Sequence, residues 1–434
     1  MLPLYDSTRR RIALATFFAV GVLPTLVVAG WAAWWRSPWH VRAEAERLEW
    51  QLGLRVSSLA AVRHPRPGVA VYEGLELCDP ETDRPVFWCR AIEADGNGVA
   101  QEAAGTRPAL QLTVSSPKIN ASAWDQLWRL LDRVLSRRAG LADRALRVTA
   151  EELAVAGLES SMKLAELRGR VETISQGMQA EAVFRMAGQT GSEPARLLVM
   201  RNRQVTPPAV AFALETGSSP LPCPLLAMGL GGFGPLGAQS TFQGTLRSVQ
   251  SRDGPSGELF GEFAGVELER LVSDRLPSAI SGPAEIQVKM ARFHGGRLQD
   301  AAAAMAAGPG MVSRSLVEAA VQHLGLTGGV GIDRPDRLIP YEKLAAWVTC
   351  DAKGLRIQGL SPGESPRTIL AGQRGPILSQ SQSPATPLPL AAMARALTPE
   401  AEDLLPLARK SDDMLRRLPA SEAPSPADGE NSLR

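Results

Sequence analysis

Cysteine and histidine are scarce in this chain of 434 residues, which contains four of each. The cysteines are Cys78, Cys89, Cys223 and Cys350, and the histidines are His40, His64, His294 and His323. No two cysteines form a CxxC pair, and no histidine has the spacing of a metal-ligand set. The sequence therefore predicts no metal centre and no other cofactor.

Aromatic residues make up only 5% of the chain, and its formal net charge is +2, from 47 basic and 45 acidic residues. After the first residues no dense basic run appears, so the composition argues against a nucleic acid as partner. The apolar content is mainly Leu, Val and Ala, often alternating with polar residues.

One long apolar run is present. The segment Ile12–Trp35 carries no charge, follows Arg9, Arg10 and Arg11, and ends in a cluster of tryptophans. As a helix it would measure about 36 Å, which exceeds the roughly 30 Å hydrocarbon core of a bilayer. Arginines favour the cytoplasmic side and tryptophans the interface. We therefore predict a single-pass membrane protein with a cytoplasmic N-terminus at 1–11, a transmembrane helix at 12–35 and the remainder outside the cytoplasm.

A cleaved signal peptide is the alternative reading of this run. Its apolar region normally spans about 7–15 residues before a cleavage site of small residues. Here the run is longer, and tryptophans stand where small residues are expected, so the pattern favours an uncleaved anchor. Pro24 is tolerated in such a helix when nearby groups bond to the freed carbonyl.

From Val56 onward the apolar residues recur with period two, which is typical of strands. Leu110, Leu112 and Val114 share one parity, and so do Met178, Phe184 and Met186. Further strands are predicted at 86–94, 145–155, 162–174, 195–201, 209–215, 240–249, 257–265, 284–293, 296–304 and 354–360, with the alanine-rich 301–307 a poor strand. Such alternation predicts an antiparallel sheet with one apolar face.

Helical signals are fewer. A helix is expected from Ser37-Pro38 to about Gln51, closed by Gly53. Two amphipathic helices are expected at 122–138, capped by Ser122, and at 313–324, ending at Gly325. The fold class predicted from residues 36–360 is thus mainly β with a few helices. From 361 to 434 Pro, Ser and Gln predominate, which predicts disorder with one helix at 398–418.

Two short motifs have the residues of a nucleotide-binding or catalytic pattern but lack the flanking strand or helix that the pattern needs. Residues 229–234 read GLGGFG, but a dinucleotide site needs a strand before it and a helix after it, and prolines stand on both sides here. Residues 359–363 read GLSPG, but Pro362 prevents the helix that a nucleophile elbow requires. Acidic pairs such as Asp79 with Asp83 lack a histidine partner. The sequence therefore predicts a protein that is not an enzyme.

Cys78 and Cys89 flank a turn-like segment that contains Asp79-Pro80. In a hairpin centred on this turn they could face each other and form a disulfide in an oxidising compartment. Two unpaired, half-buried thiols are the other reading, and the sequence leaves both open.

The order of these parts resembles the AsmA-like family. The resemblance rests on the anchor followed by Leu52–Val56, Pro67–Leu77 and Asp79-Pro80, and on Ala145–Val155, Phe242–Leu246, Gly261–Leu271 and Ile280–Ala284. It implies an elongated, curved antiparallel sheet capped by short helices, with an apolar groove for lipid, and a role in lipid transport or outer-membrane biogenesis. The chain is shorter than the larger members and lacks their long tracts of repeated strands.

We therefore expect a membrane-anchored periplasmic protein that binds or transfers membrane lipids along an apolar β-groove. The candidate lipid-facing residues are Leu110, Leu112, Val114, Met178, Phe184 and Met186. The alternative is a structural or adaptor protein of an envelope assembly, and a degenerate hydrolase is a third reading. A further possibility is that the sheet folds over on itself into a closed core and binds nothing.

Overall fold

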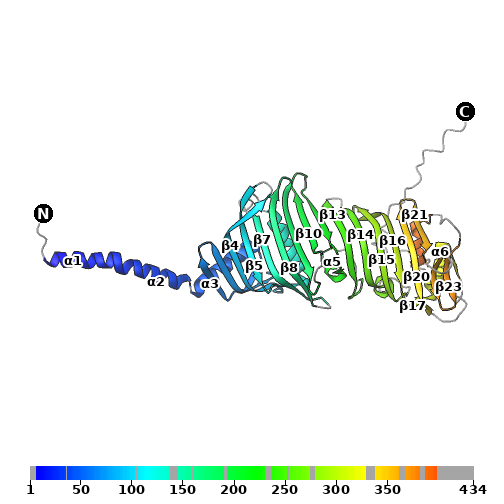
Figure 1. Cartoon of the computed structure of the whole chain (residues 1–434), viewed down its shortest axis with the longest axis horizontal. Helices are drawn as coiled ribbons and strands as arrows, with labels where there is room; N and C mark the ends of the chain where they lie inside the picture. The colour runs from blue at the N-terminus through cyan, green and yellow to red at the C-terminus, as the bar shows by residue number, and fades with distance from the viewer. Residues whose placement is uncertain are drawn as a thin grey trace, which may run out of the picture. The chain divides into compact units, whose positions relative to one another are not determined.

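The computed structural model describes residues 6–35, 37–102, 105–136, 145–158, 161–189, 193–229, 236–251, 254–273, 279–328, 338–360, 367–381 and 387–397. The chain divides into two compact units, Met1–Gly157 (unit 1) and Leu158–Arg434 (unit 2). The predicted fold class is confirmed: the protein is mainly β with a few helices, and an apolar helix precedes the strands (Figure 1).

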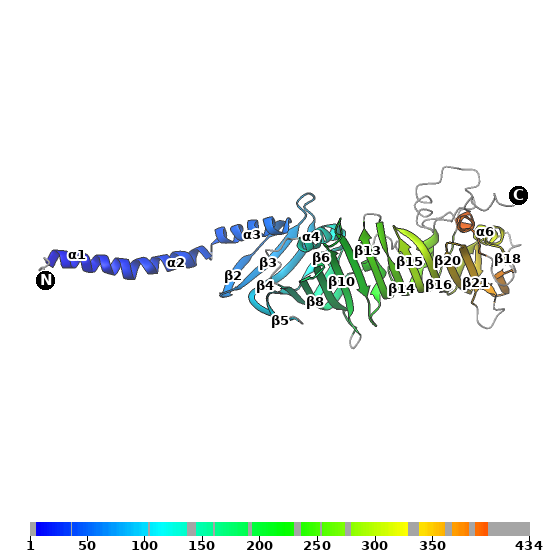
Figure 2. The ribbon, with the colours of Figure 1, turned by 90° about the horizontal axis from the view of Figure 1, so that it is seen from above.

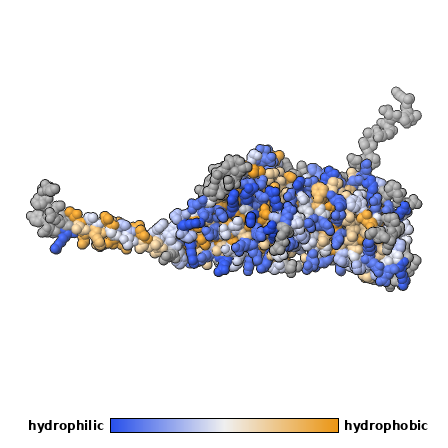
Figure 3. Space-filling view, in the orientation of Figure 1, coloured by the Kyte–Doolittle hydropathy of each residue, from blue (hydrophilic) through white to orange (hydrophobic). Residues whose placement is uncertain are grey.

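The N-terminal helix consists of α1 (Asp6–Phe17), the π-helical turn η1 (Phe18–Val22) and α2 (Leu23–Trp35). Its segment Arg10–Trp35 is long and apolar enough to cross a membrane, and none of its most apolar window is buried in the protein. Figure 3 shows this helix mainly in hydrophobic colours. Pro24 is the second residue after the π-helical turn, and the Thr25 hydroxyl donates to the Gly21 carbonyl at 2.7 Å. Both features accommodate a proline within a spanning helix.

Two further helices belong to unit 1. Helix α3 (Pro38–Leu52) begins at Ser37, whose side chain accepts a bond from the His40 amide, and ends at Gly53 in the left-handed conformation, as predicted. A 3-10 turn, η2 (Ala121–Ala123), leads into α4 (Trp124–Ser136). The predicted Ser122 cap is wrong, because the Asn120 side chain accepts the bond from the Ser122 amide. The predicted end of this helix at 138 lies outside the described residues.

The sheet of unit 1 has β3 and β4 at its centre. Its strands are β1 (Arg55–Ser58), β2 (Ala61–Arg66), β3 (Val69–Cys78), β4 (Pro85–Glu102), β5 (Gly105–Ser115), β6 (Lys118–Asn120) and β7 (Ala145–Ala156). Strands β1 and β2 pair with β3, β3 with β4, and β4 with β5 and β6, all antiparallel. Strand β7 runs parallel to β5 and β6. This departs from the purely antiparallel prediction because α4 lies between β6 and β7, and a helical crossover is what parallel strands need.

The sheet of unit 2 is an antiparallel series whose neighbours lie side by side in Figures 1 and 2. In spatial order its main strands are β8 (Met162–Ile174), β9 (Gly177–Met186), β10 (Ala195–Asn202), β11 (Ala209–Glu215), β13 (Thr241–Ser251), β14 (Gly254–Glu267), β15 (Pro283–His294), β16 (Arg297–Ala307) and β20 (Lys343–Asp351). Strand β12 (Leu221–Pro222) pairs with one end of β13. The turn from β15 to β16 uses Gly295 and Gly296, both with positive φ, as a tight hairpin requires.

The remaining elements lie toward the C-terminus, apart from α5 (Cys223–Gly229) and the π-helical turn η3 (Glu269–Ser273). They are β17 (Gly310–Ser313), α6 (Arg314–Leu324), β18 (Leu326–Gly328), β19 (Leu338–Tyr341), β21 (Gly354–Gly359), β22 (Thr368–Gly372), β23 (Gly375–Gln380) and α7 (Leu390–Leu397). Strands β21 and β22 both pair with β20, β23 with β22, and β18 with β23, while β17 and β19 form a separate small sheet. Helix α6 ends at Gly325 as predicted, and Ser313 is its N-cap, with the side chain accepting a bond from the Leu316 amide.

The prediction of disorder from residue 361 is wrong for the part that the structure describes. Strands β22 and β23 form a hairpin, and α7 packs against α6. The physical reason is local: Ile369, Leu370, Ile377 and Leu378 are all buried. These two short apolar runs lie in a segment rich in Pro and Ser, and the prediction rested on the composition of the whole segment. The helix predicted at 398–418 lies outside the described residues.

Candidate functional site

The strand register of unit 2 separates its side chains into two faces. Directly paired residues of an antiparallel sheet point to the same side. Leu214, Leu246 and Leu259 are paired in this way across β11, β13 and β14, and the row continues through Ala291 of β15. We call this side the apolar face. Its members include Val171, Ala180, Ala182, Phe184, Leu197, Val199, Phe212, Leu214, Leu246, Leu259, Phe263, Ile286, Val288, Phe293, Leu298, Ala303, Met305, Ala346, Val348, Leu355 and Ile357.

The residues between them point to the opposite side, which we call the ion-pair face. Ion pairs link neighbouring strands there: Arg170–Glu181 at 3.1 Å, Arg247–Glu215 at 3.4 Å, Arg247–Glu258 at 3.7 Å and Arg292–Asp300 at 2.8 Å. These side chains are partly exposed, so each pair contributes little to stability. Their charges are nevertheless matched across the strands, and none of them belongs to the apolar face.

The apolar face is unevenly covered. At one end of the strands Leu221, Phe242 and Phe263 are buried, and the two phenylalanine rings lie 4.8 Å apart. Beyond this end many side chains of the face are only half-buried, although Val199, Leu214 and Leu246 are buried. The half-buried members are Leu197, Phe212, Leu259, Ile286, Val288, Phe293, Leu298 and Val348. Helix α5 contacts β12, helix α6 contacts β17 and β18, and helix α7 contacts β21. The half-buried part of the apolar face thus has the features of a groove floor rather than of a closed core.

The predicted residues fall in both units. Met178, Phe184 and Met186 share the apolar face of unit 2 through their pairings in β8, β9 and β10, with Met178 and Phe184 buried and Met186 half-buried. Leu110, Leu112 and Val114 lie in β5 of unit 1, where Leu112 and Val114 pair with Ala94 and Ile92. Val114 is buried, and the other two are half-buried. Each predicted triplet therefore shares a face, as the alternation indicates.

Several residues of the apolar face were not singled out from the sequence. Phe212, Ile286, Val288 and Phe293 lie in segments that were predicted as strands, so the alternation carried a signal for them. The shift of register between Val288 and Met290 changes the parity along β15 and obscures that signal. Val348 could not be found in this way, because β20 was not predicted at all.

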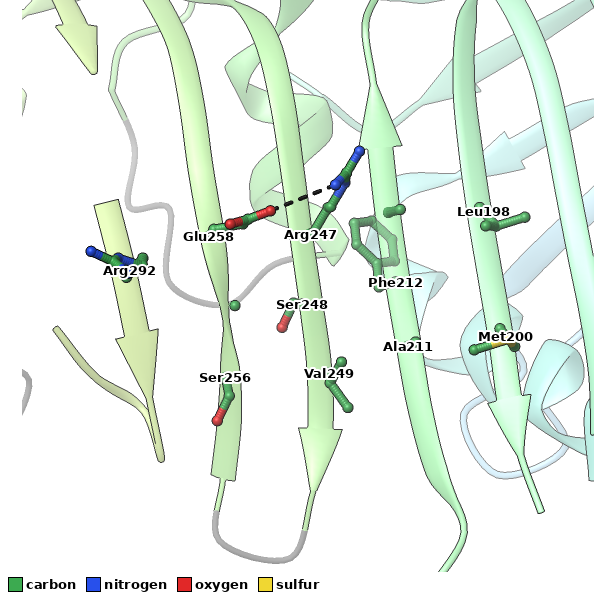
Figure 4. A pocket seen from close by; sticks show the side chains of 12 residues that line it. Leu198, Met200, Ala211, Phe212, Arg247, Ser248, Val249, Ser256, Glu258 and Arg292 are labelled. Carbon is green, nitrogen blue, oxygen red and sulfur yellow. Dashed lines mark ion pairs between the residues drawn. The ribbon is translucent and has the colours of Figure 1, made fainter. Parts of the chain in front are cut away.

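A depression of about 440 Å³ lies on the ion-pair face (Figure 4). Leu198, Met200 and Val249 supply apolar side chains, while Arg247 and Glu258 form an ion pair at its rim. Val249 is 43% exposed, so the depression is open to solvent. Its small apolar area is surrounded by paired charges, and the hydroxyl of Ser256, which also lines it, lies 2.9 Å from Nδ1 of His294.

The four cysteines are free and buried. The disulfide between Cys78 and Cys89 is not formed, because the register places Cys89 opposite Leu75 and Cys78 opposite Pro85. Burial raises the pKa of the Cys89 thiol to about 11, which keeps it protonated and unreactive at neutral pH. Structurally, these thiols act as small apolar side chains.

The acidic turn and the two rejected motifs also have structural explanations. The Asp79 carboxylate accepts a bond from the Thr82 hydroxyl at 2.6 Å, which lowers the Asp79 pKa and holds the turn between β3 and β4.

Gly229 of the first motif ends α5, and residues 230–235 lie outside the described part. Gly359 ends β21. Among the described residues no group of three His, Cys, Asp or Glu could hold a metal ion.

Comparison of the chain with protein-family models, with curated proteins and with solved structures found no match.

Proposed function

We propose that the protein is a membrane-anchored lipid-binding protein, which holds or moves acyl chains along the apolar face of unit 2. The observation that carries this proposal is the row of half-buried apolar side chains across β10, β11, β14, β15 and β16. Apolar area left partly in water costs free energy, at roughly 25 cal/mol per Å². An acyl chain lying on the face would remove that cost without requiring any polar partner.

The proposed location is the bacterial inner membrane, with residues 1–11 in the cytoplasm and both units in the periplasm. The apolar segment Arg10–Trp35 supports a single crossing, and the arginines before it support the orientation. A reporter that is active only in the periplasm, fused after Gly53, should be active. Replacing Arg9, Arg10 and Arg11 with neutral residues should weaken that activity, whereas a reporter active only in the cytoplasm would contradict the orientation.

Membership of the AsmA-like family remains part of the proposal. It is supported by the combination of an apolar N-terminal helix with a largely antiparallel sheet that carries one apolar face. The role that the family implies is lipid transport or outer-membrane biogenesis.

The test compares two neighbouring residues of β14 that point to opposite faces. Leu259 is half-buried on the apolar face, and Glu258 lies on the ion-pair face. The full-length protein is purified in detergent, and the phospholipid retained per chain is counted by native mass spectrometry. Lipid held around the anchor is the same in every variant and cancels in the comparison.

We expect Leu259→Gln to lose retained phospholipid and Glu258→Gln to keep the wild-type amount, with both variants folded by circular dichroism. Equal lipid in the wild type and in both variants would contradict binding at the apolar face. If no phospholipid is retained beyond that of the isolated anchor, the protein instead fits the structural or adaptor alternative.

A further inference from the structure

Three aromatic side chains meet within unit 1, at the end of the apolar helix. They are Trp35, the last residue of α2, His40 in the first turn of α3, and His64 in β2. The ring centroids of Trp35 and His64 are 4.1 Å apart with the planes nearly perpendicular, and those of Trp35 and His40 are 4.8 Å apart. The two imidazole rings lie 5.8 Å from each other.

The two histidines differ in their surroundings. His40 is only 7% exposed, and its Nε2 has no hydrogen-bond partner among the residues that the structure describes. His64 lies at the exposed side of the cluster. Removal of water around the ring lowers the pKa of His64, the nearby His40 lowers it further, and Glu44 acts in the opposite direction.

The charged groups around the cluster are few. On α3, Glu44 faces His64 and also lies 3.5 Å from Arg47. On β3, the pKa of Tyr72 is raised mainly by burial, and then by Glu44. Glu44 can therefore offset one positive charge in the cluster, but it is already shared with Arg47.

A second link joins the same segments. Ser37 donates to the Trp34 carbonyl from its hydroxyl at 2.7 Å and from its amide at 3.0 Å. Both bonds are independent of pH in the neutral range. The contacts of Trp35 with the two imidazoles are the ones that depend on protonation.

We propose that Trp35, His40 and His64 form a proton-sensitive latch, which holds the end of α2 against α3 and β2 while the His64 imidazole is neutral and loosens when it is charged. The latch couples the position of the membrane helix to the acidity of the solution. It is independent of whether the apolar face of unit 2 binds lipid.

The direction of the pH effect follows from the lowered pKa of His64. A histidine of lowered pKa binds fewer protons in the docked state than in the released state. The latch is therefore at full strength above the ordinary histidine pKa of about 6.5 and weakens as the pH falls below that value toward the lowered pKa.

The test uses the full-length protein in phospholipid nanodiscs and measures backbone amide exchange at pH 7.5 and pH 5, corrected for the intrinsic pH dependence. We expect residues 37–41 and 61–66 to lose protection at pH 5 in the wild type. In His64→Phe the ring contact with Trp35 can remain while the charge is removed, so protection should be retained at pH 5. His323→Phe, in α6 of unit 2, is the matched control and should behave as the wild type.

A second measurement guards against a variant that fails to fold. With only four histidines in the chain, the ring resonances of His64 can be followed by NMR in the wild-type protein. We expect the His64 midpoint to lie below the ordinary histidine pKa of about 6.5, and His40→Gln to raise it. The same loss of protection in the wild type and in a folded His64→Phe, or a His64 midpoint at or above the ordinary value, would overturn the latch.

Discussion

The two faces of the unit 2 sheet are built by the same strands and yet have opposite character. On the ion-pair face, charges on neighbouring strands compensate one another and stay in contact with water. On the apolar face, leucine, valine and phenylalanine are paired across the strands, and many of them are only half-buried. The ion-pair face needs no further partner, whereas the apolar face would gain free energy from a further covering layer. The proposed function rests on this difference.

The largest effect is expected at the C-terminal edge of this sheet. Truncation after Leu360 removes β22, β23 and α7, and with them the buried Ile369, Leu370, Ile377 and Leu378. Burying one such side chain is worth about 1.5–3 kcal/mol, so unit 2 should lose several kcal/mol of stability. Thermal unfolding followed by circular dichroism should show a clearly lower midpoint than for a chain ending after Leu397. An unchanged midpoint would mean that the hairpin does not belong to the fold.

A single strand can separate the two faces. In β13, Leu246 is 3% exposed on the apolar face, and Val249 is 43% exposed on the ion-pair face. Leu246→Ala should lower the free energy of unfolding by about 2–5 kcal/mol, because it leaves a cavity. Val249→Ala should change it by less than about 0.5 kcal/mol. Denaturant unfolding of both variants measures the difference, and equal costs would show that the faces have been assigned wrongly.

The ion-pair face should respond least. Arg292 and Asp300 are paired at 2.8 Å, with 53% and 28% of their side chains exposed. Because water and salt screen such a pair, Arg292→Ala should cost no more than about 1 kcal/mol. The cost should shrink further in concentrated salt, as denaturant unfolding at two ionic strengths would reveal. A cost that is large and independent of salt would indicate a structural role that partial exposure does not suggest.

Much of this fold could be predicted from the sequence because period-two alternation is a local signal. The strands around Met178–Met186 and Leu110–Val114 follow it directly. The helix start at Ser37-Pro38 and the helix ends at Gly53 and Gly325 are local signals of another kind, and they were predicted as well. Alanine-rich 301–307 was judged a poor strand and yet belongs to β16, since its neighbours β15 and β20 determine its conformation. The β22–β23 hairpin was missed because composition over a long window outweighed two short apolar runs.

The candidate site could be predicted only in part. Alternation shows which residues share a face, but it does not show how well that face is covered. Phe184 and Met178 turned out to be buried, while Phe212 and Val288 of the same face remain half-buried. Alternation carries no information on this cover: Leu221, Phe242 and Phe263 close one end of the strands through β12 and β14, whereas Met178 lies in the row of Val210 and Gln250 at the other end. The pairing of Trp35 with His64 likewise joins segments that have no common sequence pattern.

Photolabelling tests the central claim most directly. Membranes that contain the full-length protein are loaded with a phospholipid carrying a diazirine on its acyl chain, irradiated, and the labelled residues are identified by peptide mass spectrometry. Labels within unit 2 should fall on half-buried members of the apolar face, such as Phe212, Leu259 and Val288, and not on Val249 or Met200 of the ion-pair face. Labels that are equally frequent on both faces, or confined to the segment Arg10–Trp35, would contradict the account.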